Sequence, residues 1–171
     1  MHAPLARTDQ EAEIYIEMTP CHRCGGHGFT GDSTVIHLGD DLGTRWTGTC
    51  SRCGVAREFV FRLPQEVTLG SAARYDFGTD GPSELLDPGQ WMTVADLAAR
   101  RAPAPTRDDL LLAVAAFGEV ARFIPDGADD VPAGAFRTDE GRAALRQWPS
   151  RFTRRWLQEA ADALRRDAGG R

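Results

Sequence analysis

The chain has 171 residues, of which 42% are hydrophobic and 26% are charged, and its formal net charge at pH 7 is −5. These values are those of a globular protein, and they exclude wholesale disorder. No apolar run approaches the roughly eighteen residues that a membrane helix needs, and the first residues lack the apolar centre of a secretory signal. We therefore expect a folded cytoplasmic protein without a membrane partner, in which thiols stay reduced.

The first third of the chain is predicted to form strands. Residues 14–18 alternate apolar and polar side chains, as a half-buried strand does. Residues 33–39 and 44–50 are two further β-prone runs, and the turn between them indicates a hairpin. A fourth run, residues 57–63, places Phe59, Phe61 and Leu63 on one face. Four such strands would form a small antiparallel sheet whose apolar face requires a cover.

The hydrophobic period then changes to that of helices. Residues 67–90 contain many glycines and prolines and are predicted to be an irregular connector. Region 91–171 is predicted to contain three to four helices. The expected helices cover residues 92–102, 107–124, 138–148 and 150–167, with Thr106, Thr138 and Ser150 as N-caps. The second of them has a broad apolar stripe, which is typical of a central, buried helix.

Four cysteines form two C-x-x-C pairs, Cys21–Cys24 and Cys50–Cys53, with 25 residues between the pairs. Two residues between thiols allow both sulfurs to reach one ion at about 2.3 Å, and a second pair completes a tetrahedron. Each pair is followed by a glycine, which permits the backbone angles of a tight turn. Local disulfides and free buried thiols are the alternatives, and a reducing compartment disfavours the disulfides.

The stretches CHRCGG and CSRCGV, with the hairpin between them, resemble the two knuckles of the zinc ribbon group over residues 12–64. The resemblance implies that Cys21, Cys24, Cys50 and Cys53 hold one structural Zn²⁺. The rest of the chain resembles no named family, and the whole looks like a bacterial zinc-ribbon protein. We therefore expect an α+β fold in which a zinc-ribbon β module, residues 1–66, packs against the helical region in one compact unit.

The histidines beside the first pair raise the question of a catalytic metal. Four thiolates leave no open position for water, which catalytic zinc requires. Neither His22 nor His27 is followed by the glutamate of an H-x-E motif, and His37 is interpreted as a strand residue. A thioredoxin-like redox pair would open a helix, whereas glycines follow both pairs here.

Outside the thiol pairs, two charged segments are candidate functional surfaces. The acidic segment, residues 76–96, contains Asp76, Asp80, Glu84 and Asp87. We interpret Asp80 and Asp87 as turn residues and Glu84 as part of a first helical turn, rather than the four as a catalytic set. The basic segment, residues 146–155, contains Arg151, Arg154 and Arg155 between aromatic side chains, a mixture that can bind nucleic acid. The two segments could also complement each other within the fold.

The leading interpretation is a zinc-binding, non-enzymatic protein-interaction module, such as an accessory, regulatory or toxin-neutralising partner. The first alternative is a nucleic-acid-binding regulator that uses the ribbon and the three arginines. The second is an enzyme whose site the sequence hides. A zinc ribbon is a scaffold used for many tasks, so the fold does not decide among them.

Overall fold

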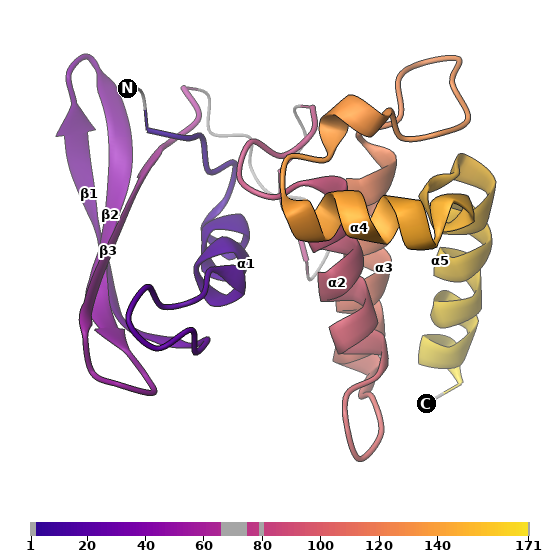
Figure 1. The fold of residues 1–171 in the computed structure, drawn as a ribbon, viewed down its shortest axis with the longest axis horizontal. Helices are drawn as coiled ribbons and strands as arrows, with labels where there is room; N and C mark the ends of the chain where they lie inside the picture. Colours follow the sequence, from indigo (N-terminus) through magenta and orange to yellow (C-terminus); the bar gives the residue numbers. More distant parts are fainter. Residues whose placement is uncertain (1–2, 66–74, 79–80, 171) are drawn as a thin grey trace. The chain divides into compact units, whose positions relative to one another are not determined.

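The computed structural model describes residues 3–65, 75–78 and 81–170, and it confirms the α+β class. The chain divides into two compact units. The first comprises Met1–Ser71 and Phe77–Thr79, and the second comprises Ala72–Asp76 and Asp80–Arg171. A helix and a three-stranded sheet belong to the first unit, and four further α-helices belong to the second (Figure 1).

The sheet of the first unit consists of β1 (Phe29–Leu38), β2 (Asp41–Cys50) and β3 (Ala56–Arg62). The strands are antiparallel in the order β1-β2-β3, which confirms the predicted hairpin (Figure 1). Trp46 lies opposite Phe59. Because side chains alternate along a strand, Trp46, Phe59 and Phe61 share one face of the sheet.

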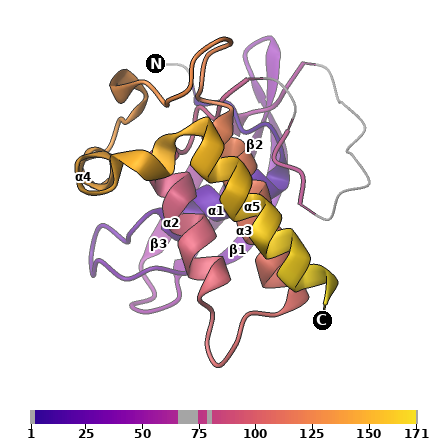
Figure 2. The ribbon, with the colours of Figure 1, turned by 90° about the vertical axis from the view of Figure 1, so that its right-hand side faces the viewer.

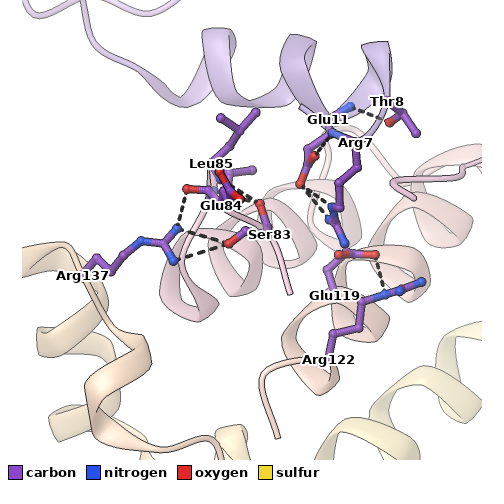
Figure 3. Close-up of polar contacts among 10 residues, drawn as sticks. Arg7, Thr8, Glu11, Ser83, Glu84, Leu85, Glu119, Arg122 and Arg137 are labelled. Atoms are coloured by element: carbon purple, nitrogen blue, oxygen red, sulfur yellow. Dashed lines mark hydrogen bonds and ion pairs between the residues drawn. The ribbon is translucent and has the colours of Figure 1, made fainter. Parts of the chain in front are cut away.

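Residues 14–18, predicted as a strand, belong instead to helix α1 (Asp9–Met18), so the prediction of four strands was wrong. The Thr8 hydroxyl accepts a hydrogen bond from the Glu11 N–H at 3.2 Å and caps the helix. The Glu11 carboxylate accepts from the Arg7 N–H at 2.7 Å and pairs with the Arg7 guanidinium at 2.7 Å (Figure 3). These local polar contacts favour a helix, and five alternating residues are too few to exclude one.

Helix α1 supplies a cover for the apolar face of the sheet. The Tyr15 ring meets the Phe59 ring edge to face at a centroid distance of 6.4 Å and the Phe61 ring at 5.7 Å. Aromatic pairs prefer this geometry, which adds to the free energy gained by burying the rings. The prediction that the C-terminal helices pack on this face stays a prediction.

Four helices make up most of the second unit, as the spacing predicts. They are α2 (Pro88–Ala99), α3 (Arg107–Ala121), α4 (Asp139–Gln147) and α5 (Arg154–Gly169), with 3₁₀ turns at Ala133–Ala135 and Pro149–Phe152. Helix α3 contacts both α2 and α5, so it is the central helix (Figure 2). Within the described ranges, none of the helices is both long and apolar enough to cross a membrane.

Two of the three predicted N-caps are confirmed. The hydroxyls of Thr106 and Thr138 accept hydrogen bonds from the backbone three residues later, at 3.2 and 2.9 Å. Ser150 was the wrong choice for α5, because Pro149–Phe152 forms a 3₁₀ turn and Thr153 caps the helix instead. The 3₁₀ turn places Phe152 in the core, where it is 1% exposed, so helix α5 and its N-cap begin three residues later than predicted.

The first turns of α2 and α4 approach each other closely at two glycines. A Cβ added to Gly89 would lie 2.4 Å from the Cα of Gly141, whereas a Cβ added to Gly118 in α3 would meet nothing within 4 Å. Gly89→Ala should therefore lower the free energy of unfolding by about 1–3 kcal/mol through overpacking, although alanine favours helices. Gly118→Ala is the matched control and should raise it by up to about 1 kcal/mol. Urea denaturation measures both; equal gains from both variants would contradict the close approach.

Candidate metal centre

Two loops of the same conformation present the four cysteines. Cys21 and Cys24 precede β1, Cys50 is the last residue of β2, and Cys53 lies in the connection from β2 to β3. In each loop the N–H of the following glycine donates to the carbonyl of the first cysteine, at 2.8 Å for Gly25 and 2.9 Å for Gly54. Both glycines have positive φ, 64° and 71°, a conformation that side chains disfavour. The glycines noted in the sequence are thus required by the turns.

The loops bring the four thiols into one cluster whose Sγ atoms all lie within 4.8 Å of one another. The Sγ atoms of Cys21 and Cys53 are 3.7 Å apart, and those of Cys24 and Cys50 are 3.8 Å apart. A tetrahedral ion with bonds of about 2.3 Å places its sulfurs about 3.8 Å apart. These distances exclude disulfides, whose S–S bond is about 2.05 Å. The predicted ligand residues are therefore brought together in a geometry that fits a metal ion.

Backbone N–H groups favour thiolate at this cluster. The N–H groups of Cys53 and Arg52 lower the pKa of the Cys50 thiol to about 6, although burial opposes them. Burial raises the pKa of Cys21, but the N–H groups of Arg23 and Cys24 outweigh it and the pKa is lowered. At Cys53 the Val55 N–H lowers the pKa, while burial and the neighbouring thiols raise it to about 11. Metals bind thiolates, so the lowered pKa values of Cys21 and Cys50 favour metal binding at two of the four thiols.

Arg57 ties the end of α1 to the loops, a role that the sequence did not reveal. Its guanidinium donates to the carbonyl of Thr19 at 2.8 Å and to that of Gly28 at 3.3 Å, and it lies 4.8 Å from the Phe59 ring centroid. The Nδ1 of His27 is 2.9 Å from the carbonyl of Glu17. These contacts hold the ligand loops in place.

The histidines lie outside the cluster that the cysteines form. His22 and His37 are exposed, and His27 bonds to the end of α1. Among the described residues, the only group of side chains placed to hold a metal ion is the set of four cysteines. That no histidine is a ligand stays a prediction.

The arginines predicted to contact nucleic acid make contacts within the second unit. Arg151 forms two hydrogen bonds with the Asp96 carboxylate, at 2.9 and 2.5 Å, and lies 4.8 Å from the Trp156 ring centroid. Arg154 donates to the carbonyl of Ala128 at 3.2 Å, and Arg155 pairs with a glutamate one turn away at 2.8 Å. The acidic and basic segments thus complement each other at Asp96 and Arg151. Nucleic-acid binding stays a prediction.

The four candidate carboxylates of the acidic segment have different surroundings. Asp80 lies outside the described residues, Glu84 is exposed and Asp76 is half-buried. Asp87 is fully buried, and it caps α2 by accepting from the Gln90 N–H at 3.0 Å. The sequence led us to interpret Asp87 as a turn residue, whereas the structure makes it the N-cap of α2, and its burial is more complete than that role requires.

Comparison of the chain with protein-family models, with curated proteins and with solved structures finds no match. The geometry of the cysteine cluster is therefore the basis for the proposal that follows.

Proposed function

We propose that the protein is a zinc-stabilised, non-enzymatic module that binds another protein. The observation that supports this most directly is the cluster of four thiols at the spacing of a tetrahedral ion. Zinc prefers four thiolates in structural sites, whereas a catalytic site keeps one position for water. Cys21, Cys24, Cys50 and Cys53 would hold the ion, and the ion would supply folding free energy.

A structural ion suits the small size of this sheet. Three strands with one covered face are near the minimum for independent stability. Strand β1 contributes no buried residue, so little apolar burial stabilises it. An ion that joins the loop before β1 to the loop after β2 would compensate, because the free energy of metal binding is then part of the free energy of folding.

Exposed apolar side chains support the binding role. Val35 is 62% exposed and Leu42 is 49% exposed, and both belong to the β1–β2 hairpin. His37 pairs with Leu42, and Val35 is the neighbour of His37 on the same face. Two neighbouring apolar side chains that are exposed to solvent on one face of the hairpin indicate a surface that binds a partner.

The metal is tested on the full chain, purified without added metal and examined by elemental analysis. We expect about one zinc per chain, released when a mercurial reagent titrates the thiols. An iron content near one, with a coloured protein, would replace zinc in the proposal. A content near zero for all transition metals, in a folded protein, would contradict a metal centre.

The binding role is tested separately by affinity capture with the zinc-loaded chain from a lysate of the source cells. A specific protein that binds at a defined stoichiometry is the expected result. Failure to capture any specific partner, with zinc retained, would contradict the role in binding while leaving the metal site intact.

A further inference from the structure

Strand β1 forms one edge of the sheet, and the register shows which of its backbone groups point outward. The Ser51 N–H donates to the Gly28 carbonyl, at 3.4 Å, immediately before the strand begins. Hydrogen-bonded and non-hydrogen-bonded pairs alternate in an antiparallel ladder. The even-numbered residues of β1 therefore bond to β2. The residues whose N–H and C=O groups point away from the sheet are Phe29, Gly31, Ser33, Val35 and His37.

The hydrogen bonds between β2 and β3 agree with this register. The Leu63 N–H donates to the Leu42 carbonyl at 2.9 Å, so the even-numbered residues of β2 bond to β3 and its odd-numbered residues to β1. Gly31 and Gly48 also approach closely, since a Cβ on Gly31 would lie 2.6 Å from the Gly48 Cα. Such an approach is typical of a non-hydrogen-bonded pair.

The outward edge of β1 is long and has little of the usual protection, since Asp32 is its one acidic side chain. The strand has 10 residues, none of them buried, and in the described part of the chain its backbone bonds only to β2. Proteins usually protect an exposed edge with proline, lysine, a bulge or a covering segment. The sequence of β1, FTGDSTVIHL, contains neither proline nor a lysine or arginine. No described residue bonds to its outward N–H and C=O groups, which can therefore pair with a further strand.

The charge and polarity of the hairpin indicate what that strand would be. The β1–β2 hairpin, residues 29–50, contains Asp32, Asp40 and Asp41 and one arginine, Arg45, so its net charge is −2. Arg45 lies 3.9 Å from Glu58 of β3, and the three aspartates lie in β1 and at the turn. Val35 and Leu42 are exposed. They lie on the same face of the hairpin as the side chains of Ser33 and His37. A complementary strand would place apolar side chains beside Val35 and basic side chains near the aspartates.

We propose that β1 is a docking edge for an extended segment of a partner protein in which apolar residues alternate with basic ones. The segment adds a fourth strand by main-chain hydrogen bonds to Ser33 and Val35. Its arginines or lysines pair with the acidic hairpin. This inference rests on the proposed role in protein binding and names the surface that performs it.

The decisive variant is Ser33→Pro. Proline removes the outward N–H of Ser33, which makes no bond to β2, so the sheet stays intact. Ser33→Ala is the matched control, since it changes the side chain and keeps the N–H. The probe is a synthetic nine-residue peptide of alternating valine and arginine, with a fluorescent label, titrated against the zinc-loaded chain. Ser33→Pro should raise its Kd at least tenfold, and Ser33→Ala should change it by less than twofold.

Two further titrations keep the test valid if Ser33→Pro disturbs the fold. The same peptide with every second amide N-methylated has no donors for the edge and should bind at least tenfold more weakly. The triple variant Asp32→Asn, Asp40→Asn, Asp41→Asn should weaken binding severalfold and reduce its dependence on salt. Equal binding of the methylated and unmethylated peptides would overturn the proposal.

The remaining outcomes separate this proposal from the one on which it rests. If a lysate partner is captured equally by the parent chain and by Ser33→Pro, the role in binding stands and the edge is not its site. A parent chain that is dimeric and becomes monomeric on Ser33→Pro would show that a second copy occupies the edge, which also overturns the proposal. Capture of no partner contradicts the binding role itself.

Discussion

Replacing Cys50 with alanine is expected to reduce the metal content from about one ion per chain to nearly none and to unfold the first unit. Cys50 is 1% exposed, and its Sγ lies 3.8 Å from that of Cys24. Binding of a structural zinc ion contributes on the order of 10–16 kcal/mol, which is comparable to or larger than the net stability of a domain, about 5–15 kcal/mol. Elemental analysis measures the metal, and amide NMR signals of the three strands report on the fold.

The control for this variant is His22→Ala, which removes the exposed imidazole next to Cys21. Its zinc content should remain about one per chain, because four thiolates already complete the tetrahedron. Loss of zinc from His22→Ala together with its retention in Cys50→Ala would show that the ligand set is wrong.

Replacing Asp87 with alanine should lower the free energy of unfolding of the second unit by about 3–5 kcal/mol. The carboxylate is fully buried and accepts four hydrogen bonds. One comes from the Gln90 N–H in α2, and three come from the Arg137 N–H and from the N–H and hydroxyl of Thr138, at 2.8–2.9 Å. The variant leaves these donors without an acceptor at the starts of two helices, so urea denaturation should show a large loss.

The matched control is Asp139→Ala, which also removes an acidic side chain beside the start of α4. Asp139 is exposed and pairs with Arg142 one turn away, so its loss should lower the free energy of unfolding by less than about 0.5 kcal/mol. Both variants should keep about one zinc per chain, since the thiols are untouched. Similar stability losses in the two variants would contradict the special role of the buried carboxylate.

Features that depend on short stretches of chain could be predicted from the sequence. The ligand pairs, the glycines after them, the hairpin and the four C-terminal helices each follow from neighbouring residues. The error at residues 14–18 has the same origin. Five alternating side chains are compatible with a strand, while the cap formed by Thr8 and Glu11 lies just upstream and was overlooked.

Features that depend on contacts between distant residues could not be predicted. Asp87-Pro88-Gly89-Gln90 has the signature of a capped helix start, but nothing in it indicates that Thr138, 51 positions later, shares the same carboxylate. Likewise, the sequence suggests that the arginines at 151–155 can bind phosphate groups. Only the fold shows that Arg151 forms hydrogen bonds with Asp96, 55 positions earlier.

The set of four cysteines could be predicted from the residue pattern, because two thiols separated by two residues can face one ion whatever the rest of the chain does. The folded structure was needed to show how the two pairs meet and which helix covers the aromatic face of the sheet. It was also needed to show which strand has an edge that bonds to no other described residue. Those outcomes depend on the order of the strands and on packing between segments far apart in the chain. Local periodicity carries no information about strand order or about such packing, so the edge of β1, which pairs with no further strand among the described residues, could be recognised only in the folded protein.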